Sequence, residues 1–406
     1  MSACGEAGPR GTDVRSDCWI AVEIRTGGGL DVRLKSKVAG MYGDRIRSRL
    51  MEGCAVLGVT DAVIEVEDMG ALPWVLDARL ECAVKRALPD LDLEFLPEMR
   101  SCCSGPSRRE RLRRSRLYLP GNQPKFFVNA ALHAPDGLIF DLEDAVAPAE
   151  KDAARVVVRN ALRQVDTLGT ERMVRINQGL RGLEDLDWII PHNVHVVLIP
   201  KVEEAHQVSS VDERIRSIQR ERDLEGSVYL MPIIESAQGA WNAFGIAAAS
   251  RRVVGLAVGL EDYTADIGVP RTLEGRESFW ARSQVVNGAV AAGVQPIDTV
   301  FSDVADEEGL RASVAEAKAL GFIGKGCIHP RQIAPVHEGF APGAAELAKA
   351  KAIVLAFEKA EAEGLGVVSL GSKMIDAPVV KRAHTVITLA LEVGLLAADW
   401  RDRDEV

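Results

Sequence analysis

The segment GLIFDLEDAV, residues 137–146, is a short apolar run that ends in three closely spaced carboxylates. An apolar run of this length, bounded by turn residues, is typical of a buried strand in a parallel sheet. Seven further runs of the same kind lie between residues 116 and 328 and alternate with helical patterns. The eight candidate strands are residues 116–120, 137–141, 172–177, 194–200, 228–234, 253–259, 295–300 and 322–328.

Eight strand–helix units in about 220 residues match the size of a TIM barrel. We therefore predict an α/β fold with a (β/α)8 barrel over residues 116–335, and an open doubly wound sheet is the alternative. Helical patterns at 344–362 and 377–396 flank the Gly-rich segment GLGVVSLGSK. They predict a C-terminal helical extension over residues 336–406.

The first 100 residues have a different pattern, which predicts a small α+β module over residues 1–100. Residues 18–25 and 30–35 alternate at period two and are joined by Gly27–Gly29, which predicts a hairpin. Residues 62–67 form a third candidate strand. Apolar residues at helical spacing predict helices at 44–57 and 71–88.

The stretch between these parts, residues 101–115, is an Arg-rich linker that reads SCCSGPSRRERLRRS. A basic run can bind nucleic acid or anionic lipid. The run that holds the arginines, residues 108–116, is only nine residues long, which is too short to reverse the electrostatic field of a protein that is acidic overall. We interpret the stretch as a solvated hinge.

Composition excludes several classes of protein. The 406 residues contain 49 Lys plus Arg against 59 Asp plus Glu, a net charge of −10, which argues against a nucleic-acid binder. No apolar run approaches the roughly 18 residues that cross a bilayer, and the first residues lack the core of a signal peptide. Seven cysteines show no CxxC spacing, and we interpret the spacing of His192 and His195 as coincidence rather than a metal pair. We expect a cytoplasmic protein that binds neither nucleic acid nor a membrane.

Charged and polar side chains follow nearly every candidate strand. Because the active site of a TIM barrel lies at the carboxyl ends of its strands, these side chains are expected to share one site. They are Tyr118, Asn122, Lys125, Asp141, Glu143, Asp144, Arg175, Asn177, Lys201, Glu235, Glu261, Asp262, Asp298 and His329.

This set points to a hard divalent cation, because carboxylates without Cys or His companions suit Mg²⁺. Glu235 and Asp262, on neighbouring strands, can reach one ion, and Arg175 offers a planar fork for a substrate carboxylate. A metal with an arginine suits a 2-oxo acid and aldol- or Claisen-type chemistry. Lys201 is the one strand-end lysine that fits a Schiff-base aldolase, a route that the carboxylates make less favourable. Nucleotide-binding and hydrolase motifs are absent from the sequence.

The barrel segment resembles the citrate lyase beta subunit, within the HpcH/HpaI aldolase–citrate lyase family. The matching blocks are RSRLYLPGN, GLIFDLEDAV, MVRIN, LIPK, PIIES, GLEDYTADIG, KGCIHPRQI and GVVSLGSKMIDAP. The resemblance implies Mg²⁺ on Glu235 and Asp262, a substrate carboxylate on Arg175, and a catalytic Asp376 presented by a neighbouring subunit of a homo-oligomer, a trimer or hexamer. It also implies that Tyr118 and Lys125 contact the thioester carrier. The expected substrate-binding set is Arg175, Glu235, Tyr118, Lys125 and His329.

The first 100 residues resemble the citrate lyase gamma subunit, an acyl carrier protein, in the blocks LKSKV, YGDRIR, LGVTDA, EDMGAL and DARLE. In that family a serine near the N-terminus bears a CoA-derived phosphoribosyl prosthetic group, and the best match here is Ser16. A gapless alignment places Arg15 at that position instead.

The resemblance implies a fused beta/gamma citrate lyase component. Such a protein cleaves a citryl or related 3-hydroxyacyl thioester to oxaloacetate, or another 2-oxo acid, and an acetyl thioester. An alpha-type transferase subunit would be a possible partner. Two alternatives stay open: a lyase for free CoA thioesters such as citramalyl-CoA or malyl-CoA, and a non-catalytic acyl-binding scaffold.

Overall fold

Eight parallel strands close into a barrel, in the order β10-β11-β12-β5-β6-β7-β8-β9. The closed ring confirms the predicted TIM barrel and excludes the open sheet. All eight candidate segments form strands, and inward-facing apolar residues such as Ile139, Met173 and Met231 fill the interior. The strands are β5 (Ser115–Pro120), β6 (Gly137–Asp141), β7 (Glu171–Arg175), β8 (Val196–Ile199), β9 (Tyr229–Ile234), β10 (Gly255–Val258), β11 (Gln295–Asp298) and β12 (Gly324–Cys327).

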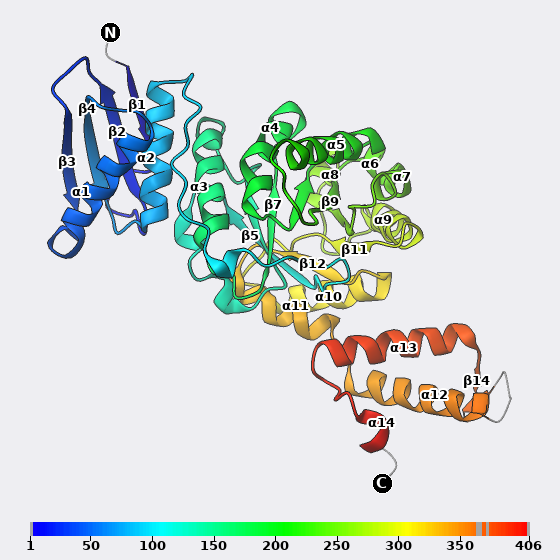
Figure 1. Cartoon of the computed structure of the whole chain (residues 1–406). Coiled ribbons are helices and arrows are strands. Elements are labelled where there is room, and N and C mark those ends of the chain that lie inside the picture. Colours follow the sequence, from blue (N-terminus) through cyan, green and yellow to red (C-terminus); the bar gives the residue numbers. More distant parts are fainter. Residues whose placement is uncertain (1–2, 363–367, 371–372, 404–406) are drawn as a thin grey trace. The chain divides into compact units, whose positions relative to one another are not determined.

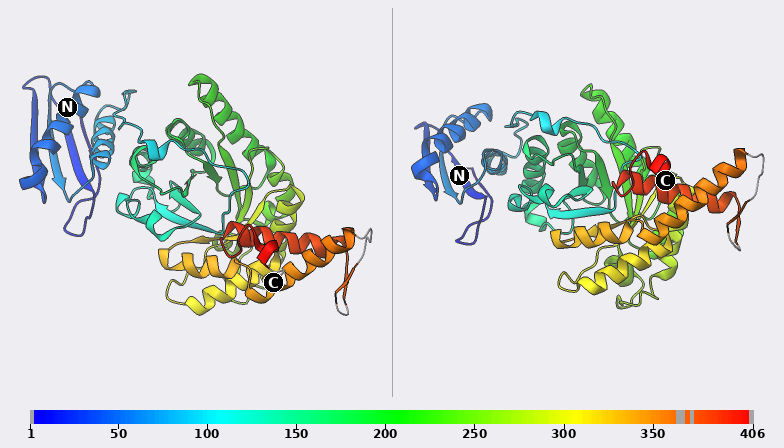
Figure 2. Two further views of the ribbon diagram at one scale, coloured as in Figure 1. Left: turned by 60° about the horizontal axis from the view of Figure 1, so that its bottom comes forward. Right: turned by 90° about the horizontal axis from the view of Figure 1, so that it is seen from below.

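Helices surround the strands (Figures 1 and 2). They are α3 (Lys151–Gln164), α4 (Gly179–Ile189), α5 (Ala205–Glu221), α6 (Ala237–Trp241), α7 (Ala243–Ala247), α8 (Leu260–Asp266), α9 (Phe279–Ala291) and α10 (Glu307–Leu320). Short 3-10 turns lie in the connections between these elements, and η2 and η3 take the place of a helix between β5 and β6. They are η2 (Pro124–Phe126), η3 (Ala130–His133), η4 (Pro148–Glu150), η5 (Ile190–His192) and η6 (Pro330–Gln332). The computed structural model describes residues 3–362, 368–370 and 373–403 in two compact units, Met1–Ile333 and Ala334–Val406.

The N-terminal module is a four-stranded sheet with two helices. Its strands are β1 (Cys4–Ala7), β2 (Cys18–Ile24), β3 (Leu30–Ser36) and β4 (Ala62–Asp68), and its helices are α1 (Ala39–Val56) and α2 (Pro73–Ala87). The strand order β1-β2-β4-β3 shows that the predicted hairpin was wrong, because β4 lies between β2 and β3. The more apolar β4 takes the inner position, while β3, with Asp31, Arg33 and Lys35, lies at the edge, where charges are tolerated.

The module packs on the barrel within the same unit, with α2 against α3 (Figure 1). Arg159 on α3 forms a fully buried ion pair with Glu81 on α2 at 2.7 Å. The rings of Trp74 and Phe127 stack across the same interface, with centroids 6.3 Å apart.

The Arg-rich stretch is not a solvated hinge. It contains a 3-10 turn, η1 (Ser101–Cys103), and runs against the barrel. Arg113 is fully buried and pairs with Glu171, the first residue of β7, at 2.7 Å. Arg172 donates to the carbonyl of Gly105 at 3.1 Å. The solvated-hinge interpretation was wrong because the anionic partner of Arg113 lies 58 residues further along the chain.

The remaining elements are α11 (Ile333–Phe340), α12 (Ala344–Ala362), β13 (Val368–Leu370), β14 (Lys373–Ile375), α13 (Ala377–Glu392) and α14 (Trp400–Arg403). α12 and α13 pack side by side around Val354, Ile387 and Trp400 (Figure 1). Of the Gly-rich segment 364–373, residues 364–367 and 371–372 lie outside the described residues. Across the described part of the chain, no helix combines the length and the apolarity that a membrane span requires.

Candidate active site

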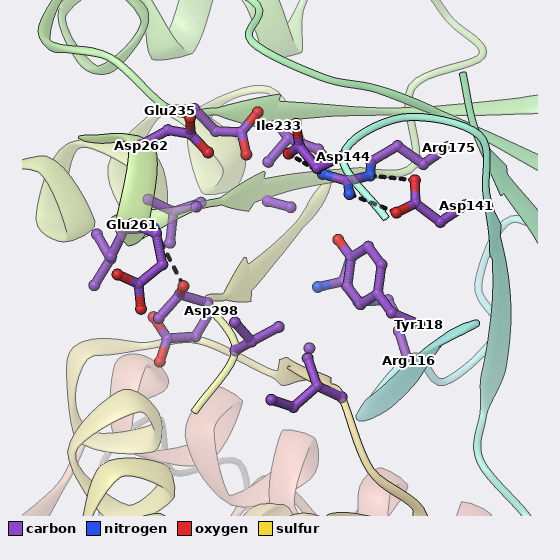
Figure 3. Close-up of a pocket in the computed structure, with 18 of the residues that line it drawn as sticks. Arg116, Tyr118, Asp141, Asp144, Arg175, Ile233, Glu235, Glu261, Asp262 and Asp298 are labelled. Carbon is purple, nitrogen blue, oxygen red and sulfur yellow. Dashed lines mark hydrogen bonds and ion pairs between the residues drawn. The ribbon is translucent and has the colours of Figure 1, made fainter. Parts of the chain in front are cut away.

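A cavity of about 380 Å³ lies at the carboxyl ends of the barrel strands. Figure 3 shows acidic side chains and Arg175 around it. The structure therefore brings together most of the predicted strand-end residues. The polar side chains that line it are Arg116, Tyr118, Asp141, Asp144, Arg175, Glu235, Glu261, Asp262, Asp298 and Thr299.

Arg175 ends β7 and is held by carboxylates of its own chain. Its Nε and Nη2 atoms donate to the two oxygens of Asp141, each at 2.7 Å. Its Nη1 atom contacts Glu143 at 2.9 Å and Asp144 at 3.2 Å. Burial alone lowers the pKa of Arg175, but the hydrogen bond and charge of Asp141 outweigh it and raise the pKa above the usual range. Asp141 thus occupies one edge of the guanidinium, while Glu143 and the half-exposed Asp144 share its Nη1 atom.

Glu235 follows β9 and is almost fully buried. Its Oε2 atom accepts the backbone N–H of Lys201 at 2.8 Å. Desolvation raises the pKa of Glu235 to about 7, and the negative charges of Asp262 and Glu143 add to the rise. Gly259 makes room for this carboxylate, because a Cβ there would lie 2.5 Å from Glu235 Oε1.

Asp262, in the first turn of α8, contacts the ammonium of Lys201 at 3.1 Å. The same Nζ atom lies 3.8 Å from Glu143 and 3.8 Å from Asp144. Lys201 therefore partly neutralises three carboxylates, of which Asp144 and Asp262 line the cavity.

Glu235 and Asp262 fit the ligand chemistry of Mg²⁺. Among the residues that the structure describes, no group of three or more His, Cys, Asp or Glu side chains is placed to hold a metal. Mg²⁺ is usually held by one or two carboxylates and completed by water and substrate oxygens. Two carboxylates beside an open cavity, one of them seated where Gly259 lacks a side chain, match that pattern.

The other predicted residues are placed differently. Tyr118 lines the cavity, and the guanidinium of Arg175 lies 5.3 Å from the centre of its ring. Lys125 is exposed on η2 and does not line the cavity. His329 precedes η6, where its Nδ1 atom accepts the backbone N–H of Arg331 at 3.2 Å, so this nitrogen caps a turn.

Two predicted residues lie outside the barrel. Ser16 is half-buried in the loop before β2, with a left-handed φ of 53°. Asp376 belongs to the second unit and caps α13, where its side chain accepts the backbone N–H of Val379 at 3.2 Å.

Sequence reasoning missed Arg116 and Gly259. Arg116 is the second residue of β5, and the sequence of β5, SRLYLP, has the polar–apolar alternation of an ordinary strand. Gly259 stands directly before the GLEDY carboxylates, and a glycine beside a strand end is a sign of close approach that could have been used.

Comparison with known proteins finds relatives of both parts of the chain. A family model described as HpcH/HpaI aldolase/citrate lyase matches residues 114–330, and an acyl carrier model described as malonate decarboxylase delta subunit (MdcD) matches residues 9–87. The citrate lyase subunit beta of Haemophilus influenzae is 42% identical over 283 residues, which cover 69% of this chain and 97% of that protein. The mitochondrial citramalyl-CoA lyase of Mus musculus is 33% identical over 296 residues, covering 69% and 87%.

A solved structure is also similar. Protein CitE from Mycobacterium tuberculosis, in complex with magnesium, acetoacetate and coenzyme A, gives a TM-score of 0.59 at 31% identity, covering 70% of this chain and 99% of that chain. The family model over residues 114–330 spans the barrel, which contains Glu235, Asp262 and Arg175. The chain therefore belongs to the HpcH/HpaI aldolase/citrate lyase family of carbon–carbon lyases, and it carries an acyl-carrier-like domain before its barrel.

Proposed function

We propose that this protein is a Mg²⁺-dependent lyase that cleaves a citryl or related 3-hydroxyacyl thioester to a 2-oxo acid and a shorter acyl thioester. The observation that carries the proposal is the single cavity shared by Glu235, Asp262 and Arg175. A non-catalytic scaffold would have no use for two carboxylates and a guanidinium gathered at the barrel mouth.

The residues divide the work as follows. Glu235 and Asp262 would hold Mg²⁺, which would supply Lewis-acid polarisation of the hydroxyl oxygen that becomes the ketone oxygen. Arg175, oriented by Asp141, binds the adjacent carboxylate through Nη1, where the substrate takes the place of the half-exposed Asp144. Tyr118 forms one wall of the cavity and keeps water from that carboxylate.

The carbon–carbon bond breaks when the hydroxyl proton leaves. The electron pair of the broken bond moves to the α-carbon of the thioester, which must then be protonated. We assign both transfers to Asp376 of a neighbouring copy in a homo-oligomer. Its carboxylate accepts the hydroxyl proton and returns it to carbon, so the step is balanced without another acid.

The docked N-terminal module supports a substrate carried on this chain. Asp17, next to Ser16, forms a buried ion pair with Arg79 at 2.7 Å. Arg79 also donates to the carbonyl of Asn122 at 2.9 Å, in the loop after β5. The loop of Ser16 is thus tied to a loop at the carboxyl end of the barrel. A prosthetic arm on Ser16 would deliver the thioester at a high effective concentration, and an alpha-type subunit would reload it.

The alternative is a lyase for free CoA thioesters, favoured by the likeness to citramalyl-CoA lyase. Intact-mass measurement of protein from its own host, followed by assay of 2-oxo acid release with Mg²⁺, separates the two. A CoA-sized adduct that Ser16→Ala abolishes supports the carrier. Unmodified protein that turns over citramalyl-CoA supports the alternative. Absence of release from both kinds of substrate contradicts the lyase proposal.

A further inference from the structure

Arg116 is a buried cation without an anionic partner. It is 1% exposed, and its Nη1 atom reaches only the thioether sulfur of Met231, at 2.9 Å. Its Nε atom has no hydrogen-bond partner. In the part of the chain that the structure describes, Arg116 forms no ion pair. A thioether is a weak acceptor, so this buried charge lacks a counter-charge in direct contact with it.

Other buried arginines each have an anionic or a carbonyl partner. Arg113, Arg159 and Arg79 each pair with a buried carboxylate at 2.7 Å. Arg172 lacks a carboxylate but donates to the carbonyls of Asn193 and Gly105. The exception at Arg116 therefore needs an explanation, because an uncompensated buried charge costs stability.

Arg116 lines the same cavity as Arg175 and Glu235 (Figure 3). Strand register places it at the floor. At the carboxyl ends of the strands, Pro120 of β5, Asp141 of β6 and Arg175 of β7 are in register. Arg116 lies four residues before Pro120, near the start of β5, and is in register with Gly137, the first residue of β6. Asp298 also borders the cavity, but Lys325 at 2.7 Å and Arg282 at 3.2 Å already hold its carboxylate.

We propose that Arg116 binds a second carboxylate of the substrate, so that the 2-oxo acid released by this site is a dicarboxylate. The inference rests on the proposed function, in which Arg175 and the metal take the first carboxylate and the ketone. The carbon chain of the substrate beyond the ketone then extends toward the floor of the cavity. There its second carboxylate pairs with the positive charge of Arg116. A 2-oxo acid that ends in a methyl group leaves Arg116 unpaired and binds more weakly.

The test compares freshly prepared oxaloacetate with pyruvate, each titrated calorimetrically into the full chain with Mg²⁺. The wild type is expected to prefer oxaloacetate by roughly tenfold to a hundredfold. Arg116→Met, which is similar in length, is expected to remove the preference and to leave pyruvate affinity nearly unchanged. Arg116→Lys is expected to keep part of it. Arg216→Met, an exposed arginine on α5, is the charge-matched control and should leave the ratio unchanged.

A second readout separates binding from support of the fold. Without ligand, Arg116→Met is expected to raise the Tm, because it removes an uncompensated buried charge. A lowered Tm or an unfolded variant, an equal loss of both ligands, or an unchanged ratio in Arg116→Met overturns the role of Arg116. If the wild type binds pyruvate and oxaloacetate equally, only this inference fails. If it binds neither 2-oxo acid with Mg²⁺, the proposed function fails as well.

Discussion

Asp141 and Arg175 are direct neighbours in the barrel: β6 and β7 place them in register, and both carboxylate oxygens of Asp141 accept from Arg175 at 2.7 Å. The backbone pairing thus fixes the partner that orients the guanidinium. Asp141 also accepts the backbone N–H of Glu143 at 2.9 Å, which holds the carboxylate in turn. Arg175 is therefore preorganised before any ligand arrives.

Asp141→Asn is expected to lower kcat/KM for 2-oxo acid release by about 10- to 100-fold, because a partner that orients a binding residue is lost while the shape is kept. Mg²⁺ binding, measured by the shift in Tm that Mg²⁺ causes, should be unchanged. Asp144→Asn is the matched control: its side chain is half exposed and contacts Arg175 at Nη1 alone, so a smaller loss is expected. An Asp141→Asn enzyme with wild-type kinetics would show that Asp141 does not position Arg175.

Glu235→Gln and Asp262→Asn are each expected to weaken Mg²⁺ binding by more than about tenfold, since each removes one of two charged ligands. The rise in Tm with added Mg²⁺ measures the affinity, and EDTA should abolish 2-oxo acid release by the wild type. Glu261→Gln is the control, because Glu261 instead accepts from Arg271 at 2.7 Å and Ser302 at 2.9 Å. Activity that survives EDTA and both substitutions contradicts the metal assignment.

The barrel could be predicted because each strand is a local pattern, an apolar run that ends in a polar residue. The same local patterns failed where pairing is non-local. Gly27–Gly29 looks like a hairpin turn, yet β4, thirty-odd residues further on, is more apolar and takes the inner position.

Charged residues of the interior were the harder part of the site. Arg113 and Arg116 stand three residues apart in one basic run, and nothing local separates them from solvated arginines. Arg113 pairs with Glu171, whereas Arg116 lines the cavity. This difference is visible only once the strands have closed into the barrel. Carboxylates at strand ends were found because their position, rather than their partners, marks them.

The Arg159–Glu81 pair is expected to control docking of the N-terminal module. Glu81→Gln removes the main anionic partner of the buried Arg159 guanidinium and is expected to lower the free energy of unfolding by about 3–5 kcal/mol. Loss of docking should expose the Arg-rich stretch, so trypsin should cut within residues 101–115. Asp152→Asn removes the half-exposed pair with Arg86 at the same interface and is expected to cost less than about 1 kcal/mol. Equal trypsin resistance of wild type and Glu81→Gln would mean that this pair does not secure the module.

Asp376→Asn is expected to abolish turnover while Mg²⁺ binding stays intact, because the amide can still cap α13 but cannot carry a proton. Mixing Asp376→Asn with Arg175→Ala protein should restore part of the activity if one copy supplies Asp376 to another. Unchanged turnover in Asp376→Asn removes this residue from the mechanism. Mixtures that stay inactive contradict its presentation between subunits.

Buried histidines are expected to make stability fall in mild acid. His192 and His195 are nearly inaccessible, and desolvation, with nearby arginines, lowers the pKa of His192 to about 2 and of His195 to about 4, from 6.5. The unfolded chain therefore takes up protons first as the pH falls below 6.5. Stability is present above that value and lost toward pH 4, by about 2 kcal/mol for each histidine between pH 7 and 5. Urea unfolding at the two pH values measures the loss. His195→Gln should reduce it, whereas His206→Gln, on the surface, should not. If His195→Gln and the wild type lose equal stability, His195 does not cause the acid sensitivity.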